Sequence, residues 1–588
     1  MAGEAGDRTW DTHRGGTARR ELIFIGGAIA FAFVLRVLAV ALRGTYVDFD
    51  ESMCIALGRS VVTGHGYVLN GLPNVTFPFG VPLLAGATWF VTHSARWALN
   101  APTAIFGALT VIPVYLIMRH VWNRLAAATA AILYAGFPPL LFLVPYCAYA
   151  ERLYSGSEAI FLFFILMAAY AFLKAVTEAT FTSGLVAGFF SGIAFQVRQD
   201  ALGYFLALLA VAYGAAFLTK RKTVPREYLR FAFGAVLVFA LIVAPYFLWV
   251  KDVTGRCYEG PRFSKTFEMR RSLTRVIRGD DWGPALADYF RPNEDHTQIE
   301  TSYYGVSAYH RARIESGAED IPLKTLLTGL NFYNPRAAWT VLWRTLIPVG
   351  LWVFILIGFI SAVAEKRWMF LAIIAALIAP SVWVTLTLYV LGRFYLVPAV
   401  AMLLFAARGL DLTVRAFLPI VLGDRTALRA RAAAFAYLVV PTAFAVIFAT
   451  DTISHARELR ADRRDFERKL EAKLDHLTPH LTLLIPPGSR VVTWSPAPSV
   501  RADFTWLAMP EAPPEAVVDY CRKRSADFLL LRDGDGHFQH YTTDDIVKLI
   551  GGERLLFNRN FSGEYFLLFD LRDWKSPVSH DIAASGPG

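Results

Sequence analysis

Three carboxylates, those of Asp48, Asp50 and Glu51, lie close together directly after the first long apolar segment of the chain. Charged carboxylates are costly to bury in a bilayer, which places the stretch Val47–Ser52 at a membrane edge. A carboxylate held there can act as a general base toward a hydroxyl or an amine. The alternative is a solvated loop in which Asp50 only caps the start of a helix.

Further ionisable residues stand where apolar segments begin or end. Glu158 opens one in SGSEAIFLFF, while Arg198 and Asp200 interrupt another in AFQVRQDAL. Arg393 separates two apolar runs in YVLGRFYLVPA. Ionisable groups at membrane depth indicate function by default. Each residue also has a structural explanation that stays open. Glu158 would be a charge favoured at a helix N-terminus, and Arg198 with Asp200 would be an ion pair that caps a helical hairpin. Arg393 would extend its charged group to the membrane interface.

The combination of arginine and carboxylate has a chemical logic. Arginine binds phosphate through bidentate hydrogen bonds and carries a permanent charge. A carboxylate beside it can take the proton of an attacking group. Such a site, at the outer face of a bilayer, suits a substrate whose phosphate lies at headgroup level and whose tail lies in lipid.

The composition indicates a membrane protein. Of 588 residues, 55% are hydrophobic and only 18% are charged, against about 25% charged in a soluble protein. The net charge of +10 is therefore better explained by loop charges that set orientation than by nucleic-acid binding. The four cysteines, Cys54, Cys147, Cys257 and Cys521, form no CxxC motif, which argues against a zinc site and leaves a disulfide open.

The apolar runs predict a polytopic all-α protein with about eleven transmembrane helices. Their expected ranges are 22–42, 100–118, 126–145, 158–173, 183–198, 201–218, 231–250, 341–363, 368–390, 394–408 and 433–450. The proline-broken segment 76–92 is expected to be an interfacial helix on the outer side instead.

Positive charge sets the direction of the chain. With the N-terminus inside, the inner segments hold 19 Lys and Arg residues and the short outer loops hold 3. This bias predicts a cytoplasmic membrane protein whose N-terminus is cytoplasmic and whose C-terminal domain is periplasmic or extracellular.

Three regions are expected from this topology. A cytoplasmic tail covers 1–21, and a transmembrane domain covers 22–450 with large outer loops at 43–99 and 251–340. Strand-like runs such as SRVVTW, DFLLLR and EYFLLFDLR alternate with helix-like ones beyond these spans. They predict a small extracytoplasmic α/β domain over 451–588.

Taken in order, these segments resemble a family, the GT-C superfamily of glycosyltransferases. The likeness is to its lipid A aminoarabinose transferase and protein O-mannosyltransferase branch. It covers about residues 20–410 and rests on FDESMCIALGRSVVTGHGY, PFGVPLL, RHVWNR, SGSEAIFLFFILMAAY, AFQVRQDAL and GRFYLVPAVAMLL. Many relatives have an aromatic residue shortly after the acidic pair, where this chain has Met53 and Cys54.

The resemblance implies roles for the acidic residues. Asp50 would be the catalytic carboxylate that activates the acceptor, and Glu51 would assist or position. Glu158 would be the second acidic residue. Asp48 completes an Asp-x-Asp arrangement with Asp50, which leaves a divalent cation open as a cofactor, although none is certain.

The resemblance also implies the reaction. A sugar would pass from a polyprenyl-phosphate donor to a lipid, glycan or protein acceptor outside the cytoplasm, by single displacement with inversion. Arg198 would hold the donor phosphate, with Arg393 as a weaker candidate. Bacterial cell-envelope glycan synthesis is the expected setting, with membrane lipids and no nucleic acid as partners. A surface-polysaccharide polymerase or ligase and a lipid-linked sugar transporter stay open as alternatives.

Overall fold

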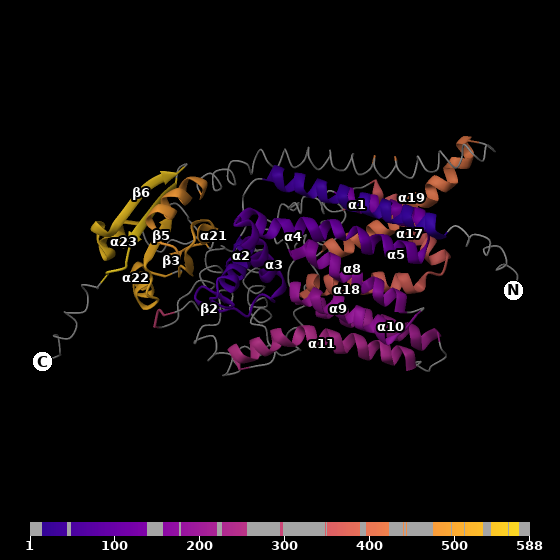
Figure 1. Cartoon of the computed structure of the whole chain (residues 1–588), viewed down its shortest axis with the longest axis horizontal. Helices are drawn as coiled ribbons and strands as arrows, with labels where there is room; N and C mark the ends of the chain where they lie inside the picture. The colour runs from indigo at the N-terminus through magenta and orange to yellow at the C-terminus, as the bar shows by residue number, and fades with distance from the viewer. Residues whose placement is uncertain are drawn as a thin grey trace.

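The structure, a computed structural model, is a bundle of helices with a five-stranded sheet at one end, beside α2 and α3 (Figure 1). It describes residues 14–43, 49–137, 157–175, 178–219, 226–255, 295–297, 347, 350–387, 395–422, 439, 443, 474–495, 497–510, 512–532, 543–561 and 564–574.

Apolar helices make up the bundle. They are α1 (Arg14–Arg43), α2 (Phe49–Val62), α3 (Gly80–Thr92), α4 (Ala95–Leu109), α5 (Val111–Val121), α6 (Arg124–Gly136), α8 (Ser157–Ala175), α9 (Phe181–Val197), α10 (Ala201–Thr219), α11 (Arg226–Thr254), α17 (Leu351–Ala364), α18 (Trp368–Thr387) and α19 (Leu396–Leu422). Within the described residues, five stretches are long and apolar enough to cross a membrane: 19–38, 95–121, 157–175, 226–254 and 396–417. The chain is a multi-pass membrane protein.

Several helices differ from the predicted spans. The span expected at 100–118 begins earlier and includes both α4 and α5, which meet at Thr110. The span expected at 394–408 is wrong at its end, because α19 continues to Leu422. Helix α3 has 13 residues, fewer than the roughly 20 that a bilayer requires. The span expected at 433–450 lies outside the described residues, apart from two isolated positions.

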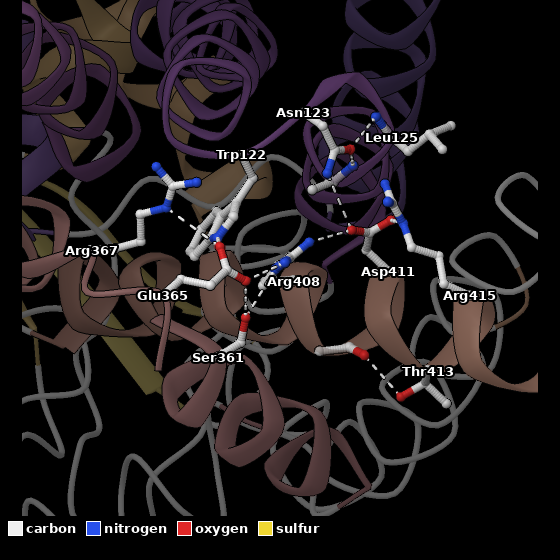
Figure 2. Close-up of polar contacts among 12 residues, drawn as sticks. Trp122, Asn123, Leu125, Ser361, Glu365, Arg367, Arg408, Asp411, Thr413 and Arg415 are labelled. Carbon is white, nitrogen blue, oxygen red and sulfur yellow. Dashed lines mark hydrogen bonds and ion pairs between the residues drawn. The ribbon is translucent and has the colours of Figure 1, made fainter. Parts of the chain in front are cut away.

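A buried polar network explains why α19 continues past Arg408. The Arg408 guanidinium donates to Asp411 at 2.7 Å and pairs with Glu365 at the end of α17. Figure 2 shows it between these two carboxylates. Asp411 is fully buried and also accepts from Arg415 at 2.9 Å. Neutralised in this way, Arg408 lies within the helix rather than at its end, where the expected span 394–408 had placed it.

The same network joins α19 to the turn between α5 and α6 (Figure 2). Asn123 donates to Asp411 at 3.4 Å, and the indole of Trp122 donates to Glu365 at 3.1 Å. Asn123 also caps α6, since its side chain accepts from the backbone of Leu125 and Ala126. The network therefore fixes three segments that are far apart in sequence.

The C-terminal residues form a mixed sheet in the order β4-β3-β5-β7-β6. The strands are β3 (Arg490–Thr493), β4 (Thr505–Ala508), β5 (Phe528–Arg532), β6 (Leu555–Phe561) and β7 (Glu564–Asp570), with helices α21 (Ala497–Ala502), α22 (Pro514–Lys523) and α23 (Thr543–Ile550) between them. Strands β3, β4 and β5 are parallel, whereas β7 is antiparallel to β5 and β6. Alternate β5 residues are buried on opposite faces, Phe528 in one core cluster and Leu529 in the other, as in a sheet covered on both sides. We call residues 474–574 the sheet unit.

The sheet unit contacts the segment that follows α2. A short hairpin, β1 (Val68–Leu69) and β2 (Leu72–Pro73), turns at Asn70, whose φ of 55° is left-handed. The Asn70 side-chain oxygen accepts a hydrogen bond from the Ala508 backbone N–H at 2.6 Å. Arg524 donates to the Asn70 carbonyl. The hairpin therefore rests on the end of edge strand β4.

Two further contacts join the sheet unit to α2 and to His296. Arg59 of α2 donates to the Ser499 carbonyl at 3.0 Å and pairs with Asp503. His296, in the second long loop, lies 3.2 Å from the Asp519 carboxylate. Burial raises the pKa of Asp519, but hydrogen bonds and charges from Lys523 and His296 outweigh it and keep the pKa below its usual value.

Replacing Asn70 by glycine is expected to loosen this contact. Glycine keeps the left-handed backbone but removes the acceptor, which leaves the Ala508 N–H unpaired at a cost of about 1–3 kcal/mol. Hydrogen exchange of a peptide that contains 505–508 should accelerate by roughly 5–100-fold if it proceeds by local opening. Asn70→Asp keeps an acceptor oxygen and serves as the control. Equal protection in the glycine variant and the native protein would contradict this account.

Candidate functional site

The predicted cation Arg198 stands in the short turn between α9 and α10, where its backbone is extended at φ −149° and ψ 129°. Its Nη1 lies 2.5 Å from the Glu158 carboxylate. Its Nε and Nη2 each lie 3.1 Å from Asp200. The ion pair with Asp200, predicted as the structural alternative, is thus present, and Arg198 also reaches across to α8.

Glu158 is buried in the first turn of α8, with 5% of its side chain exposed. Ser157 donates to its second oxygen at 3.2 Å. The Arg198 guanidinium also lies over the Phe161 ring at 5.6 Å. With 16% of its side chain exposed, Arg198 is held by two carboxylates and one ring at the surface of the bundle. These contacts fix the orientation of the guanidinium.

Two of the three predicted carboxylate residues, Asp50 and Glu51, lie at the start of α2. Asp50 is the second residue of this helix, and Glu51, which follows it, is 4% exposed. Helix α2 packs closely on α3 at Gly58. A Cβ added to Gly58 would lie 2.0 Å from the Pro82 carbonyl oxygen, so only glycine fits this contact. The side chain of Asp50 is not among those that the structure describes, and Asp48 and Arg393 lie outside the described residues altogether.

Residues 74–76, which lead into α3, are held against the Arg198 turn. Gln199 donates to the Thr76 carbonyl at 3.4 Å. From α11, Tyr246 donates to the Val75 carbonyl at 2.5 Å and the Trp249 indole donates to the Asn74 carbonyl at 2.9 Å. The segment before α3 and the Arg198 turn are therefore parts of one structure. The sequence analysis did not identify Gln199, Tyr246 and Trp249. They could have been recognised as polar or aromatic residues at the ends of apolar runs.

The described residues contain no group of three or more His, Cys, Asp or Glu side chains that could hold a metal ion. Cys54 and Cys521 are buried free thiols. We derive no catalytic step through a metal.

Two comparisons with known proteins bear on this geometry. Residues 77–249 match the family model for dolichyl-phosphate-mannose-protein mannosyltransferases. The matched segment contains Glu158 and Arg198 and ends on α11, while Asp50 precedes it. No curated protein matches the sequence significantly.

Solved structures show the same architecture. ArnT from Cupriavidus metallidurans, bound to undecaprenyl phosphate, aligns with a TM-score of 0.54 at 12% identity, over 93% of this chain and 97% of that one. The fold of this chain is therefore similar to that of ArnT. ArnT in the apo state aligns with a TM-score of 0.53 at 12% identity, over 94% of this chain and 98% of that one.

The structure of an oligosaccharyltransferase also aligns. It is the archaeal oligosaccharyltransferase AglB from Archaeoglobus fulgidus, in complex with an inhibitory peptide and a dolichol-phosphate. Its TM-score is 0.50 at 14% identity, over 87% of this chain and 69% of that one. The predicted resemblance to the GT-C superfamily is confirmed.

Proposed function

We propose that this protein is a membrane glycosyltransferase that moves a sugar from a polyprenyl-phosphate donor to an acceptor on the outer side of the cytoplasmic membrane. The observation that carries the proposal is Arg198, fixed by Glu158 and Asp200 at one end of the bundle. The structural neighbours bound to undecaprenyl phosphate and dolichol-phosphate support the class of donor.

In the proposed reaction, Asp50 takes the proton of an acceptor hydroxyl or amine as its lone pair attacks the anomeric carbon of the sugar. The bond between that carbon and the phosphate oxygen breaks, and its electron pair leaves with the polyprenyl phosphate. Arg198 stabilises the negative charge that develops on the phosphate. One displacement of this kind inverts the anomeric configuration. Glu51 positions Asp50, and Glu158 orients Arg198.

The orientation and the outer domain are parts of the same proposal. The sheet unit lies at the same end of the bundle as α2 and α3 (Figure 1). With the N-terminus in the cytoplasm, as the loop charges predict, both lie outside it. Arg393 is a further candidate for binding the donor phosphate. Among the acidic residues, Asp48 is the least favoured candidate for a catalytic role.

A donor panel tests the function. The purified full chain in lipid nanodiscs would receive labelled polyprenyl-phosphate hexoses and pentoses together with envelope lipids, glycans and proteins as acceptors. We expect the labelled sugar of one donor to be transferred to an acceptor, with polyprenyl phosphate as the second product. Nuclear magnetic resonance of the product should show inversion at the anomeric carbon. A folded protein that transfers no sugar from any donor would refute the proposal.

Neutralising Glu158 should weaken use of the donor. In Glu158→Gln, Arg198 loses a charged partner that lies 2.5 Å away, and its guanidinium is no longer held from the side of α8. Because charge-assisted hydrogen bonds contribute about 1.5–3 kcal/mol, we expect kcat/KM for the donor to fall by about tenfold or more. Steady-state kinetics with varied donor measures this. The exposed Glu178→Gln is the control, and equal kinetics in both variants would remove Glu158 from the site.

A further inference from the structure

A second arginine lies inside the bundle, on α1. Arg36 is 3% exposed, and it shares one face of the helix with Ala28 and Ala32, which are also buried. The opposite face exposes large apolar residues, among them Phe33, Val34 and Leu38. Arg36 therefore faces the other helices, as intramembrane ionisable residues almost always do.

The surroundings of Arg36 leave most of its hydrogen-bonding capacity unused. Nη1 donates to the Ala32 carbonyl of its own helix at 3.0 Å. Nε and Nη2 are buried and meet no acceptor at hydrogen-bonding geometry within the described part of the chain, and the nearest polar group facing the guanidinium is the Tyr134 hydroxyl. The guanidinium lies 5.3 Å from the centre of the Tyr134 ring, while the Tyr134 hydroxyl donates to the Gly107 carbonyl at 3.0 Å. No carboxylate among the described residues pairs with this buried charge.

Helix α4 makes room for this side chain. A Cβ at Gly107 would lie 2.5 Å from Arg36 Nε and 3.6 Å from the Ala159 side chain. Ala159 directly follows Glu158, the partner of Arg198. Arg36 thus lies where α1, α4 and the first turn of α8 meet, next to the element that holds Arg198.

An unpaired buried guanidinium does not stabilise the protein by itself. Removing a charge from water is costly, and buried donors without acceptors add to that cost. An anion that accepts from Nε and Nη2 would satisfy both donors and neutralise the charge, in the side-by-side geometry with which arginine binds phosphate. Arg36 therefore has the properties of a binding residue whose partner is an incoming anion.

We propose that Arg36 is a second phosphate-binding residue, which contacts the phosphate of the lipid carrier from the side of α1 while Arg198 contacts it from the α9–α10 turn. This inference rests on the proposed function, since that function supplies a lipid phosphate. Two cations, one on α1 and one in the α9–α10 turn, would share the charge left on the carrier when the sugar departs.

The test compares Arg36→Met with the native full chain in nanodiscs. Methionine retains an apolar side chain of similar length without the charge. The ligands are undecaprenyl phosphate, undecaprenol and inorganic phosphate, with affinity measured by quenching of intrinsic tryptophan fluorescence. We expect Kd for undecaprenyl phosphate to rise by about 10–100-fold, while Kd for undecaprenol stays the same. Arg19→Met, on the exposed part of the same helix, should match the native protein.

A stability measurement separates binding from packing. Without ligand, Arg36→Met should unfold at the same temperature as the native protein or at a higher one, since a buried unpaired charge has been removed. A lower unfolding temperature, a failure to fold, or an equal loss of affinity for undecaprenyl phosphate and undecaprenol would overturn the proposal and assign Arg36 to packing. Unchanged affinity would overturn it as well.

The outcomes also separate this proposal from the function. If Arg36→Met weakens binding of undecaprenyl phosphate but no donor supports transfer, the phosphate site stands and the glycosyltransferase assignment fails. If transfer occurs and Arg36→Met binds normally, only the role of Arg36 fails. Binding of inorganic phosphate as tight as that of the lipid, and equally sensitive to Arg36→Met, would show a free-anion site and overturn the assignment to the carrier.

Discussion

Asp50→Asn is expected to reduce sugar transfer by about 10²–10⁴-fold in kcat, the usual contribution of a general base. Asparagine has nearly the shape of aspartate but cannot take the proton of the acceptor. Asp50 is the second residue of α2, so the change also removes a charge that a helix N-terminus favours. Donor affinity should change little, because the phosphate contacts are assigned to other residues. Transfer of labelled sugar at saturating donor measures the effect.

Two variants calibrate this result. Glu51→Gln alters the buried neighbour of Asp50 and should lose less activity, since its role is to position Asp50. Glu515→Gln alters an exposed carboxylate of the sheet unit and should behave like the native protein. Transfer by a folded Asp50→Asn variant at the native rate would refute the assignment of the base. A large loss of activity in Glu51→Gln alone would assign the role of general base to Glu51 instead.

Asp411→Asn should have the largest effect on stability. The Asp411 carboxylate is fully buried and accepts from Arg408 at 2.7 Å and from Arg415 at 2.9 Å. Neutralising it leaves the buried Arg408 with Glu365 as its remaining charged partner. Breaking a buried ion pair from one side costs about 3–5 kcal/mol. The thermal unfolding temperature of the purified variant should therefore fall clearly below that of the native protein.

Graded controls separate burial from charge. The Arg415 side chain is 48% exposed, so Arg415→Gln should cost about 1 kcal/mol or less. Glu227→Gln, on the exposed start of α11, should be neutral. If Asp411→Asn and Arg415→Gln destabilise the protein equally, the network does not hold α17, α19 and the α5–α6 turn in the manner described.

The sequence was informative where a polar residue breaks an apolar run. Arg198 and Asp200 interrupt one such run, and the structure places both at the turn between α9 and α10. Glu158 opened another, and it lies at the start of α8. Their positions along the chain were predictable because helix ends follow local hydropathy. Glu158 and Arg198 are 40 residues apart in sequence. Their pairing depends on how α8 and α9 pack, so it could not be predicted from a local sequence pattern.

Longer-range contacts were beyond local reasoning for the same reason. The expected span 394–408 ended at Arg408 because a cation follows the apolar run there. In the structure Arg408 is buried, with partners on α17 and α19, and the helix continues. Strands β4 and β6 were not predicted, while β3, β5 and β7 lie in predicted strand-like runs. The unpaired donors of Arg36 become visible only when the helices around α1 are assembled.

The hydrogen bond between Asn70 and Ala508 joins residues 438 positions apart, and this separation imposes an order on biosynthesis. The ribosome makes the hairpin after α2 early, long before the strand on which it rests. During translation the acidic helix thus lacks this support. A chain interrupted before β4 would contain Asp50, Glu158 and Arg198 without the contact between the hairpin and the sheet unit. Full organisation of this end of the protein therefore awaits synthesis of the sheet unit.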